Sequence, residues 1–425
     1  MSPRFGIVKE LKLFVRDASD PPQPYVAQSI LGNHRYQKKD DQLKNSASGK
    51  GLTAARAREG ALGEAVERYS SLFWWPEELT FSRREDLAGR AIDPRSLVLY
   101  RPEQYAHVGY APYEEESELG WVAAHSLTQD EAVWIPAVAV FIGYTARAPQ
   151  EHLFAVTSNG VATGVALSDA IYRGALEIVE RDAFMIGWMH RLVAARWEPT
   201  THPDPDFRSL VETYRRRGIR IGLFQMPTDL DVTVFLAVSV TEDSEQFPAA
   251  VAGVGADPEP AAAAWKAFLE IGQIRPALRQ RLRALEHRQR MLRLVADPTL
   301  VKELDDHDLL YAHPEALGKL DFLWNTPVTK REWPARAKTC NLGWLASHLA
   351  DKGHELIYFN LTPHDMKRLS LFTVRVIIPH FQPIDFGYYE VRQGGERLYR
   401  LPFDLGLRDA RPTAGGLNPD PHPIA

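Results

Sequence analysis

Two segments of the chain repeat one arrangement of carboxylates, in which a serine- and glycine-containing loop leads into a helix with the pattern E-x-x-E-R. The loop glycines Gly51 and Gly164 each precede the first glutamate of their helix by the same spacing. The copies lie 113 residues apart, and their helices carry Glu64, Glu67 and Arg68 in the first and Glu177, Glu180 and Arg181 in the second. We expect two helices of one construction to face one site.

The spacing of these glutamates predicts a metal site. Residues three apart project from one face of a helix, and Asp169, a little over two turns before Glu177, reaches the same side. Carboxylates at that density repel one another unless a cation lies among them, and hard oxygen ligands suit Mg²⁺. A phosphate-bearing substrate would follow.

An exposed face of helix ion pairs is the alternative interpretation. Arg68 and Arg181 could neutralise Glu64 and Glu177 one turn earlier. One copy of the pattern favours this alternative, whereas two copies behind matching glycines favour a functional site. The first loop is not a Walker A motif, because Lys44 stands where that motif needs its first glycine.

Periodicity and breaker residues predict an α+β fold with antiparallel sheets. A polar loop is expected over residues 34–45. Helices are expected over residues 53–73, over residues 168–191 with Ser168 as N-cap, and from Pro260 with an interruption at Pro276, followed by a basic helix to about Val295. Strands are expected at residues 96–100, 121–127, 134–144, 219–226, 232–240, 249–256, 356–361 and 372–379.

Composition excludes several classes of protein. The net charge of −5 over 425 residues gives no basis for nucleic-acid binding. The longest apolar stretch, residues 134–144, is too short to cross a bilayer, so no membrane partner is expected. The N-terminal residues lack the apolar core of a secretory signal, and the single cysteine, Cys340, excludes an internal disulfide. A cytoplasmic protein is expected.

These motifs resemble the YcaO family. Its members carry S-x-G-K-G before one E-x-x-E-R helix and S-N-G before an E-x-x-E-R-D helix, as this chain does. The segments 266–275 (KAFLEIGQIR) and 360–383 (from NLT to VRVIIPHFQP) are similar to later family motifs in the same order. The resemblance implies a YcaO-type fold, in which the paired helices flank a site for ATP and Mg²⁺.

The resemblance also implies roles for individual residues. The expected metal ligands are Glu64, Glu67, Asp169, Glu177 and Glu180, and the expected contacts to ATP are Lys50, Arg181, Lys266 and Glu270. Two positions depart from the family pattern. Lys266 stands where arginine is usual and offers one point charge in place of a fork. Asp169 stands where glutamate is common and is one methylene shorter.

The chain ends in LNPDPHPIA, in which alternate prolines favour an extended segment. A floppy terminus or a ligand for another protein is the alternative. The P-x-P-x-P motif resembles the terminus of azoline-forming YcaO proteins, where it reaches the active site. The expected catalytic residues are therefore Pro419, Pro421, Pro423 and His422, with His190 and His380 as further candidates for a general base.

Residues 1–47 are expected to form an N-terminal β and loop segment, and residues 48–425 a YcaO catalytic domain with subdomains of about 48–157, 158–296 and 297–425. The implied activity is that of a cyclodehydratase, which uses ATP to phosphorylate a backbone amide oxygen while a thiazoline or oxazoline forms in a ribosomal peptide. The alternatives are thioamide or macroamidine formation, or a non-catalytic adaptor that binds peptide.

The implied partners are a precursor peptide, an E1-like or ThiF-like protein that binds its leader, a dehydrogenase and a second copy of the chain in a homodimer. The basic run from Arg275 to Arg293 could contact such a partner or could form a solvated face.

Overall fold

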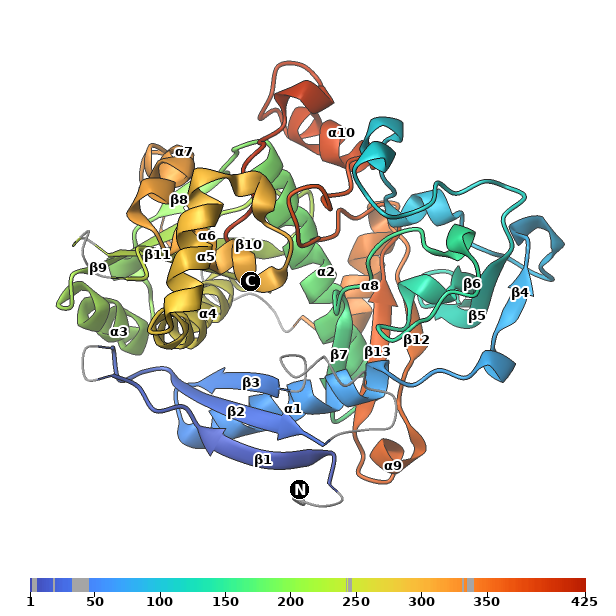
Figure 1. Cartoon of the computed structure of the whole chain (residues 1–425), viewed down its shortest axis with the longest axis horizontal. Coiled ribbons are helices and arrows are strands. Elements are labelled where there is room, and N and C mark those ends of the chain that lie inside the picture. Colours follow the sequence, from blue (N-terminus) through green and yellow to red (C-terminus); the bar gives the residue numbers. More distant parts are fainter. Residues whose placement is uncertain are drawn as a thin grey trace.

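The computed structural model describes residues 1, 6–17, 20–32, 46–241, 243, 247–330, 332–334 and 340–425. The expected polar loop over residues 34–45 lies outside these residues. In the described part, the strands form three antiparallel sheets with helices packed against them (Figure 1). No helix among the described residues is long and apolar enough to cross a membrane.

The first sheet has the order β1-β2-β3 and carries the first acidic helix. Its strands are Val8–Leu13, Tyr25–Leu31 and Ser46–Gly51, and α1 runs from Ala54 to Ser71. Thr53 caps the helix by accepting a hydrogen bond from Arg56 N. The predicted helix over residues 53–73 is thus confirmed.

The serine- and glycine-containing loop expected before α1 is instead the strand β3. This strand lies directly against the helix, because a Cβ placed on Gly49 would fall 2.1 Å from Ala61 N. Glycine is needed here for close packing of strand on helix, and the loop prediction was wrong for that reason. The glycine-containing segment before the second acidic helix is likewise a strand, because β7 spans Val161–Gly164.

The second acidic helix, α2, runs from Leu167 to Met189. Ser168 lies inside its first turn, and the N-cap position belongs to Ala166, which makes no side-chain cap. Only two residues connect β7 to α2, so the helix begins before the predicted cap residue. α2 packs on β7 and on β13 (Phe372–Ile377), and it runs through the middle of the molecule (Figure 1).

The second sheet has the order β11-β10-β9-β8 and forms much of the largest core. Three of its strands, β9 (Ile219–Gln225), β10 (Thr233–Thr241) and β11 (Ala250–Asp257), confirm the predicted ones. The remaining strand and the helices that accompany the sheet are β8 (Ala195–Trp197), α3 (Pro205–Arg215) and α4 (Pro260–Arg281).

The helix α4 continues through Pro276, where the sequence predicted an interruption. Proline cannot donate the helical hydrogen bond to the carbonyl four residues earlier, which belongs to Gly272. The guanidinium of Arg16 donates to that carbonyl at 2.7 Å, so the unpaired acceptor is satisfied from the N-terminal segment. A contact from a distant part of the chain therefore allows the helix to continue.

The third sheet has the order β4-β5-β12-β13-β7, with β6 paired to β5. The strands not yet given are β4 (Thr80–Ser82), β5 (Leu119–Ser126), β6 (Glu131–Pro136) and β12 (Ile357–Asn360). The predicted strand at residues 96–100 is wrong, because Pro94–Leu97 form a single helical turn that Asp93 caps. The predicted strand 134–144 ends at Pro136.

The remaining helices lie in the C-terminal half of the chain. They are α5 (Leu285–Ala296), α6 (Leu304–Tyr311), α7 (Asp321–Trp324), α8 (Leu342–Asp351), α9 (His364–Lys367) and α10 (Glu396–Asp404). Leu417 and Ile424 belong to the largest core cluster, so the proline-rich tail is packed into the molecule. It is not a floppy terminus.

Candidate active site

Three strand–helix units bring glutamates to one region, and backbone N–H groups of strands hold them. Glu64 of α1 accepts a hydrogen bond from Ser48 N at 2.9 Å, within its own unit. Glu270 of α4 accepts one from Val254 N of β11 at 2.8 Å. Hydrogen bonds from backbone N–H groups favour ionised carboxylates and fix their orientation.

The two repeats meet through Glu67. This glutamate of α1 accepts a hydrogen bond at 2.9 Å from Thr163 N of β7, the strand that precedes α2. Burial, together with the nearby charges of Glu64 and Glu177, raises the pKa of Glu67 to about 8. The expectation that the paired acidic helices face one site is therefore met.

The acidic cluster continues along α2. Burial raises the pKa of Glu177 to about 7, against the opposing effect of Arg181, while Glu180 and Glu270 add to the rise. Burial also raises the pKa of Glu180. Such shifts mark carboxylates placed close together without enough positive charge, which is the environment that a bound cation relieves.

Two cations expected to contact ATP lie within the cluster. Lys50 of β3 pairs with Glu270 at 2.9 Å and thereby connects the first and third units. Arg181 lies 3.5 Å from Glu180 and 3.9 Å from Glu177. Although burial opposes it, the charge of Lys50 lowers the pKa of Glu270. The side chains keep some exposure, 26% for Lys50 and 12% for Glu180, so a ligand can reach them.

Other predicted residues have local partners. Asp169 pairs with Arg173 at 3.0 Å, and no contact of the described structure places its carboxylate in the cluster. Lys266 pairs with Asp257 at 2.9 Å at the margin of the cluster, although its charge lowers the pKa of Glu180.

The ion-pair interpretation holds in part. Arg68 lies 2.7 Å from Glu64, one turn earlier on α1. The same carboxylate bonds Ser48 N, so Glu64 takes part in both a helix ion pair and the cluster.

The arrangement suits Mg²⁺ together with a phosphate ligand better than it suits a metal alone. Among the described residues, no three His, Cys, Asp or Glu side chains form a ready group of metal ligands. Mg²⁺ is usually bound by one or two carboxylates together with substrate phosphates and water. Glu67 and Glu177 can supply such carboxylates, and Lys50 and Arg181 can contact the phosphates.

The proline-rich tail approaches this region along α2. Trp188 donates a hydrogen bond to the carbonyl of Asp420 at 2.9 Å, and the ring of His422 packs edge-on against Phe184 at 5.8 Å. Burial lowers the pKa of His422 well below its ordinary value, with His307 and Arg181 contributing. His422 is therefore neutral and a weak base. It lies close enough to the cluster for the charge of Arg181 to lower its pKa.

A model of the family described as YcaO cyclodehydratase, ATP- and Mg²⁺-binding, matches residues 48–382. The chain belongs to the YcaO family. This membership confirms the resemblance read from the motifs and the expected cofactors, ATP and Mg²⁺. An uncharacterized protein of Methanothermobacter thermautotrophicus is 32% identical over 229 residues. That match covers 54% of this chain and 56% of the relative, so the chain spans about half the relative's length.

Solved structures confirm the α+β YcaO-type fold. One is described as a heterocyclase in complex with substrate and cofactor, with a TM-score of 0.80 and 25% identity over 100% of this chain and 56% of its own. YcaO from Methanopyrus kandleri, bound with AMPPCP and Mg²⁺, has a TM-score of 0.62 and 23% identity over 91% of this chain and 89% of its own.

The third strand–helix unit of this YcaO chain was not recognised as a repeat in the sequence. Val254 precedes Glu270 by the same 16 positions that separate Ser48 from Glu64, and both pairs form the same hydrogen bond. Gln273 of α4 also donates to the Ser48 hydroxyl. The shared spacing of strand glycine and helix glutamate was the signal that could have revealed the unit.

Arg375 is a second residue that sequence reasoning missed. It lies on β13 with 3% exposure and donates to the carbonyls of Val140 and Thr157 at 3.1 and 2.9 Å. Burial lowers its pKa to about 10, while the charge of Glu177 raises it. Arg375 thus supplies positive charge close to Glu177. It lies inside the 360–383 segment that resembles a family motif, but the sequence assigned no role to this arginine.

Several arginines of the basic run from Arg275 to Arg293 contact other parts of the protein. Arg275 is buried, and three further arginines form ion pairs, Arg281 with Asp305 at 2.9 Å, Arg283 with Asp17 at 2.6 Å and Arg290 with Asp306 at 2.6 Å. These pairs connect α4 and α5 to α6 and to the N-terminal segment. The run is therefore not simply a solvated face of this YcaO protein.

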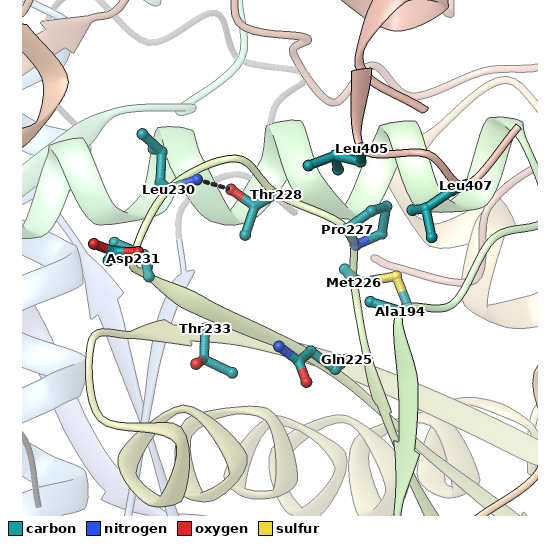
Figure 2. A pocket seen from close by; sticks show the side chains of 11 residues that line it. Ala194, Gln225, Met226, Pro227, Thr228, Leu230, Asp231, Thr233, Leu405 and Leu407 are labelled. Atoms are coloured by element: carbon teal, nitrogen blue, oxygen red, sulfur yellow. Dashed lines mark hydrogen bonds between the residues drawn. The ribbon is translucent and has the colours of Figure 1, made fainter. Parts of the chain in front are cut away.

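A cavity of about 360 Å³ lies apart from the acidic cluster, beside the loop that joins β9 to β10. Figure 2 shows Leu405 and Leu407, which follow α10, above Pro227 and Met226. In its lining, Thr228 Oγ1 accepts a hydrogen bond from Leu230 N at 3.2 Å. The cavity shares no lining residue with the YcaO site.

Proposed function

We propose that the chain is an ATP-dependent cyclodehydratase that forms thiazoline or oxazoline rings in a ribosomal peptide. The observation that carries the proposal is the hydrogen bond from Thr163 N to Glu67, because it joins the two acidic repeats at one site. The packed proline tail beside that site favours ring formation over other YcaO chemistry. The matched heterocyclase, whose structure is described as containing substrate and cofactor, supports the same conclusion.

In the proposed reaction, a Cys, Ser or Thr side chain of the peptide attacks the carbonyl carbon of the preceding amide and loses its proton. The resulting oxyanion takes the γ-phosphoryl group of ATP, and ADP leaves. The attack has already closed the five-membered ring. Phosphate then leaves, the amide nitrogen gives up its proton, and the C=N bond of the azoline forms. Phosphorylation is required because an amide oxygen is otherwise a poor leaving group.

The protein contributes position and charge to this reaction. We assign metal binding to the five acidic residues of the two repeats, which are Glu64, Glu67, Asp169, Glu177 and Glu180. We assign contacts to ATP to three cations and one glutamate, which are Lys50, Arg181, Lys266 and Glu270. When bound, Mg²⁺ neutralises charge on the phosphates. The side chains hold the phosphoryl group in line with the attacking oxygen.

We assign the catalytic contribution of the tail to Pro419, Pro421, Pro423 and His422. The ring of His422 packs against Phe184 of α2, and the carbonyl of Asp420 accepts a hydrogen bond from Trp188 of the same helix. The peptide and a leader-binding protein of E1-like or ThiF-like type remain the proposed partners, with a homodimer as the proposed assembly. A dehydrogenase acting on the ring is proposed as a later partner.

Mass spectrometry with a heavy-oxygen label tests the proposal. The purified protein, its leader-binding partner and a precursor peptide labelled in the reacting amide are incubated with MgATP. Ring formation loses one water from the peptide and moves the heavy oxygen into phosphate.

Thioamide formation would instead replace oxygen by sulfur without loss of water. A macroamidine would lose water but join an amine at a distant position, which fragmentation locates. A protein that binds peptide without MgATP turnover would be an adaptor, and the proposal would fail.

A further inference from the structure

Three successive carbonyls of the tail each accept a hydrogen bond from a different side chain. Trp188 Nε1 donates to Asp420 O at 2.9 Å, Tyr311 Oη donates to Pro421 O at 2.6 Å, and His307 Nδ1 donates to His422 O at 2.7 Å. Prolines have no N–H group and cannot join a strand ladder, so the carbonyls are what the fold can hold. We call these three donors the carbonyl clamp.

Further contacts anchor the start of the same segment. Asn418 N donates to Met189 O at 2.6 Å, and its side-chain amide donates to Trp188 O at 3.1 Å. Asp420 forms ion pairs with Arg191 at 3.1 Å and with Lys319 at 2.5 Å. The tail is thus attached to the C-terminal end of α2, the helix that carries Glu177, Glu180 and Arg181.

The partners of His307 define its tautomer. Its Nε2 accepts a hydrogen bond from Gly387 N at 3.0 Å, so the proton of a neutral ring must lie on Nδ1, which donates to the tail. His307 has 0% exposure and therefore bridges the 386–388 loop and the tail in the dry interior. A carbonyl left without this donor would be buried and unsatisfied.

The clamp also fixes the imidazole of His422. The ring lies parallel to that of His307 at 4.1 Å, and its Nε2 donates to Asp385 O at 2.9 Å. Its Nδ1 consequently carries a lone pair. Burial lowers the pKa of both histidines, and two charged rings this close would repel each other, so the stacked pair stays neutral.

We propose that His307 and Tyr311 of α6 are positioning residues, which hold the tail by its carbonyls and so keep it and His422 in place beside α2. The inference rests on the proposed cyclodehydratase function and adds residues that the sequence motifs do not contain. Neither side chain contacts the acidic cluster in the described structure. Their loss therefore acts on the peptide step and leaves nucleotide binding intact.

The first test replaces Tyr311 by Phe in the full chain. This change removes one hydroxyl and preserves the packing of the ring. We expect faster hydrogen exchange of amides 418–424 and a kcat for ring formation about tenfold lower, as befits one lost buried hydrogen bond. KM for the peptide and the Kd for MgATP stay unchanged. Tyr214→Phe is the matched control, because Tyr214 is also buried and its hydroxyl contacts Gln23 O, far from the tail.

The second test separates the two hydrogen bonds of His307. Asn places its amide at the level of Nδ1 and retains a donor for the tail, whereas Gln places its amide at the level of Nε2 and retains an acceptor for Gly387 N. We expect His307→Asn to keep most of the kcat and His307→Gln to lose it. Both variants lose the ring stack, so a difference between them reports the bond to the tail.

Unchanged tail exchange or unchanged kcat in Tyr311→Phe overturns the inference. An equal loss of MgATP affinity also overturns it, because the clamp would then be a general support of the fold. If the wild-type protein forms no ring, the proposed function fails, while the exchange measurement still decides whether the clamp holds the tail.

Discussion

Glu67 and Glu177 place carboxyl groups in a part of the protein where water is scarce. Burial is the largest cause of their raised pKa values, about 8 and about 7, and each is raised further by neighbouring carboxylates. Such raised pKa values are typical of sites where a bound ligand of opposite charge stabilises the ionised carboxylates. At the scale of single residues, the site is therefore prepared for a cation before the cation binds.

Removing one carboxylate should stop turnover without unfolding the protein. We expect Glu67→Gln and Glu180→Gln to lower kcat by about a hundredfold or more, because a neutral amide cannot hold Mg²⁺ against the phosphates. Glu59→Gln is the matched control, since Glu59 lies on the same helix α1, is 63% exposed and pairs with Arg56. Circular dichroism checks the fold, and full activity of both cluster variants would contradict the metal assignment.

The pKa of Glu67 predicts how the stability of the metal-free protein depends on pH. The pKa is raised from 4.5 to about 8, so the folded state binds a proton more tightly than the unfolded state. This group therefore favours folding at low pH, and its contribution falls as pH rises from about 4.5 to about 8. We expect Glu67→Gln to be more stable than wild type by about 4 kcal/mol near pH 8 and by less than about 1 kcal/mol near pH 5.

Urea unfolding across this range, without Mg²⁺, measures the difference. Parallel pH curves for the two proteins would show that Glu67 is not strained.

At the scale of elements, each strand–helix unit depends on glycine for close approach. Gly49 of β3 lies against α1, and Gly253 of β11 lies against α4, where an added Cβ would fall 2.5 Å from Ala267 O. The strand N–H groups that fix Glu64 and Glu270 reach the helix carboxylates only because no side chain separates the backbones. The glycines act through packing, and the glutamates depend on that packing.

Substitution of two glycines should have opposite effects on stability. Gly49→Ala is expected to lower the free energy of unfolding by about 3 kcal/mol or to prevent folding, because its Cβ would overlap the α1 backbone. Gly63→Ala is the control on α1, since a Cβ there has no atom within 4 Å and alanine favours helix by about 1 kcal/mol. Thermal unfolding measures both, and a tolerated Gly49→Ala would contradict the packing argument.

At the scale of the whole molecule, one site draws on parts of the chain that are far apart in sequence. α1, α2 and α4 supply the acidic residues, and β13 supplies Arg375 (Figure 1). The tail is held by the carbonyl clamp, whose donors lie on α2 and α6. Lys50 and Glu270 join the first and third units across the site. A ligand bound there holds several parts of the fold together.

MgATP should consequently stabilise the native protein as a unit. At a concentration about a hundredfold above Kd, we expect a gain near 3 kcal/mol, seen as a rise in Tm. A chelator of Mg²⁺ should remove most of the rise, and Glu180→Gln should not show it, whereas Glu59→Gln should behave as wild type. An equal rise with ATP in the presence of chelator would contradict the requirement for Mg²⁺.

Sequence by itself determined the local features of this protein. The repeated E-x-x-E-R pattern located α1 and α2 and their acidic faces, and apolar periodicity located β9, β10 and β11, because these depend on neighbours a few positions away. The order of the motifs along the chain indicates the family. The tail motif drew attention to His422 but not to what holds it.

Only the tertiary structure decided the contacts between distant segments. Glu67 bonds a strand of the other repeat, Arg16 satisfies the carbonyl freed by Pro276, and His307 holds a carbonyl of the tail. The two partners in each of these contacts lie about a hundred residues or more apart in the sequence, and no spacing rule connects them. Such pairs form because buried polar groups must find partners wherever folding brings a donor and an acceptor together.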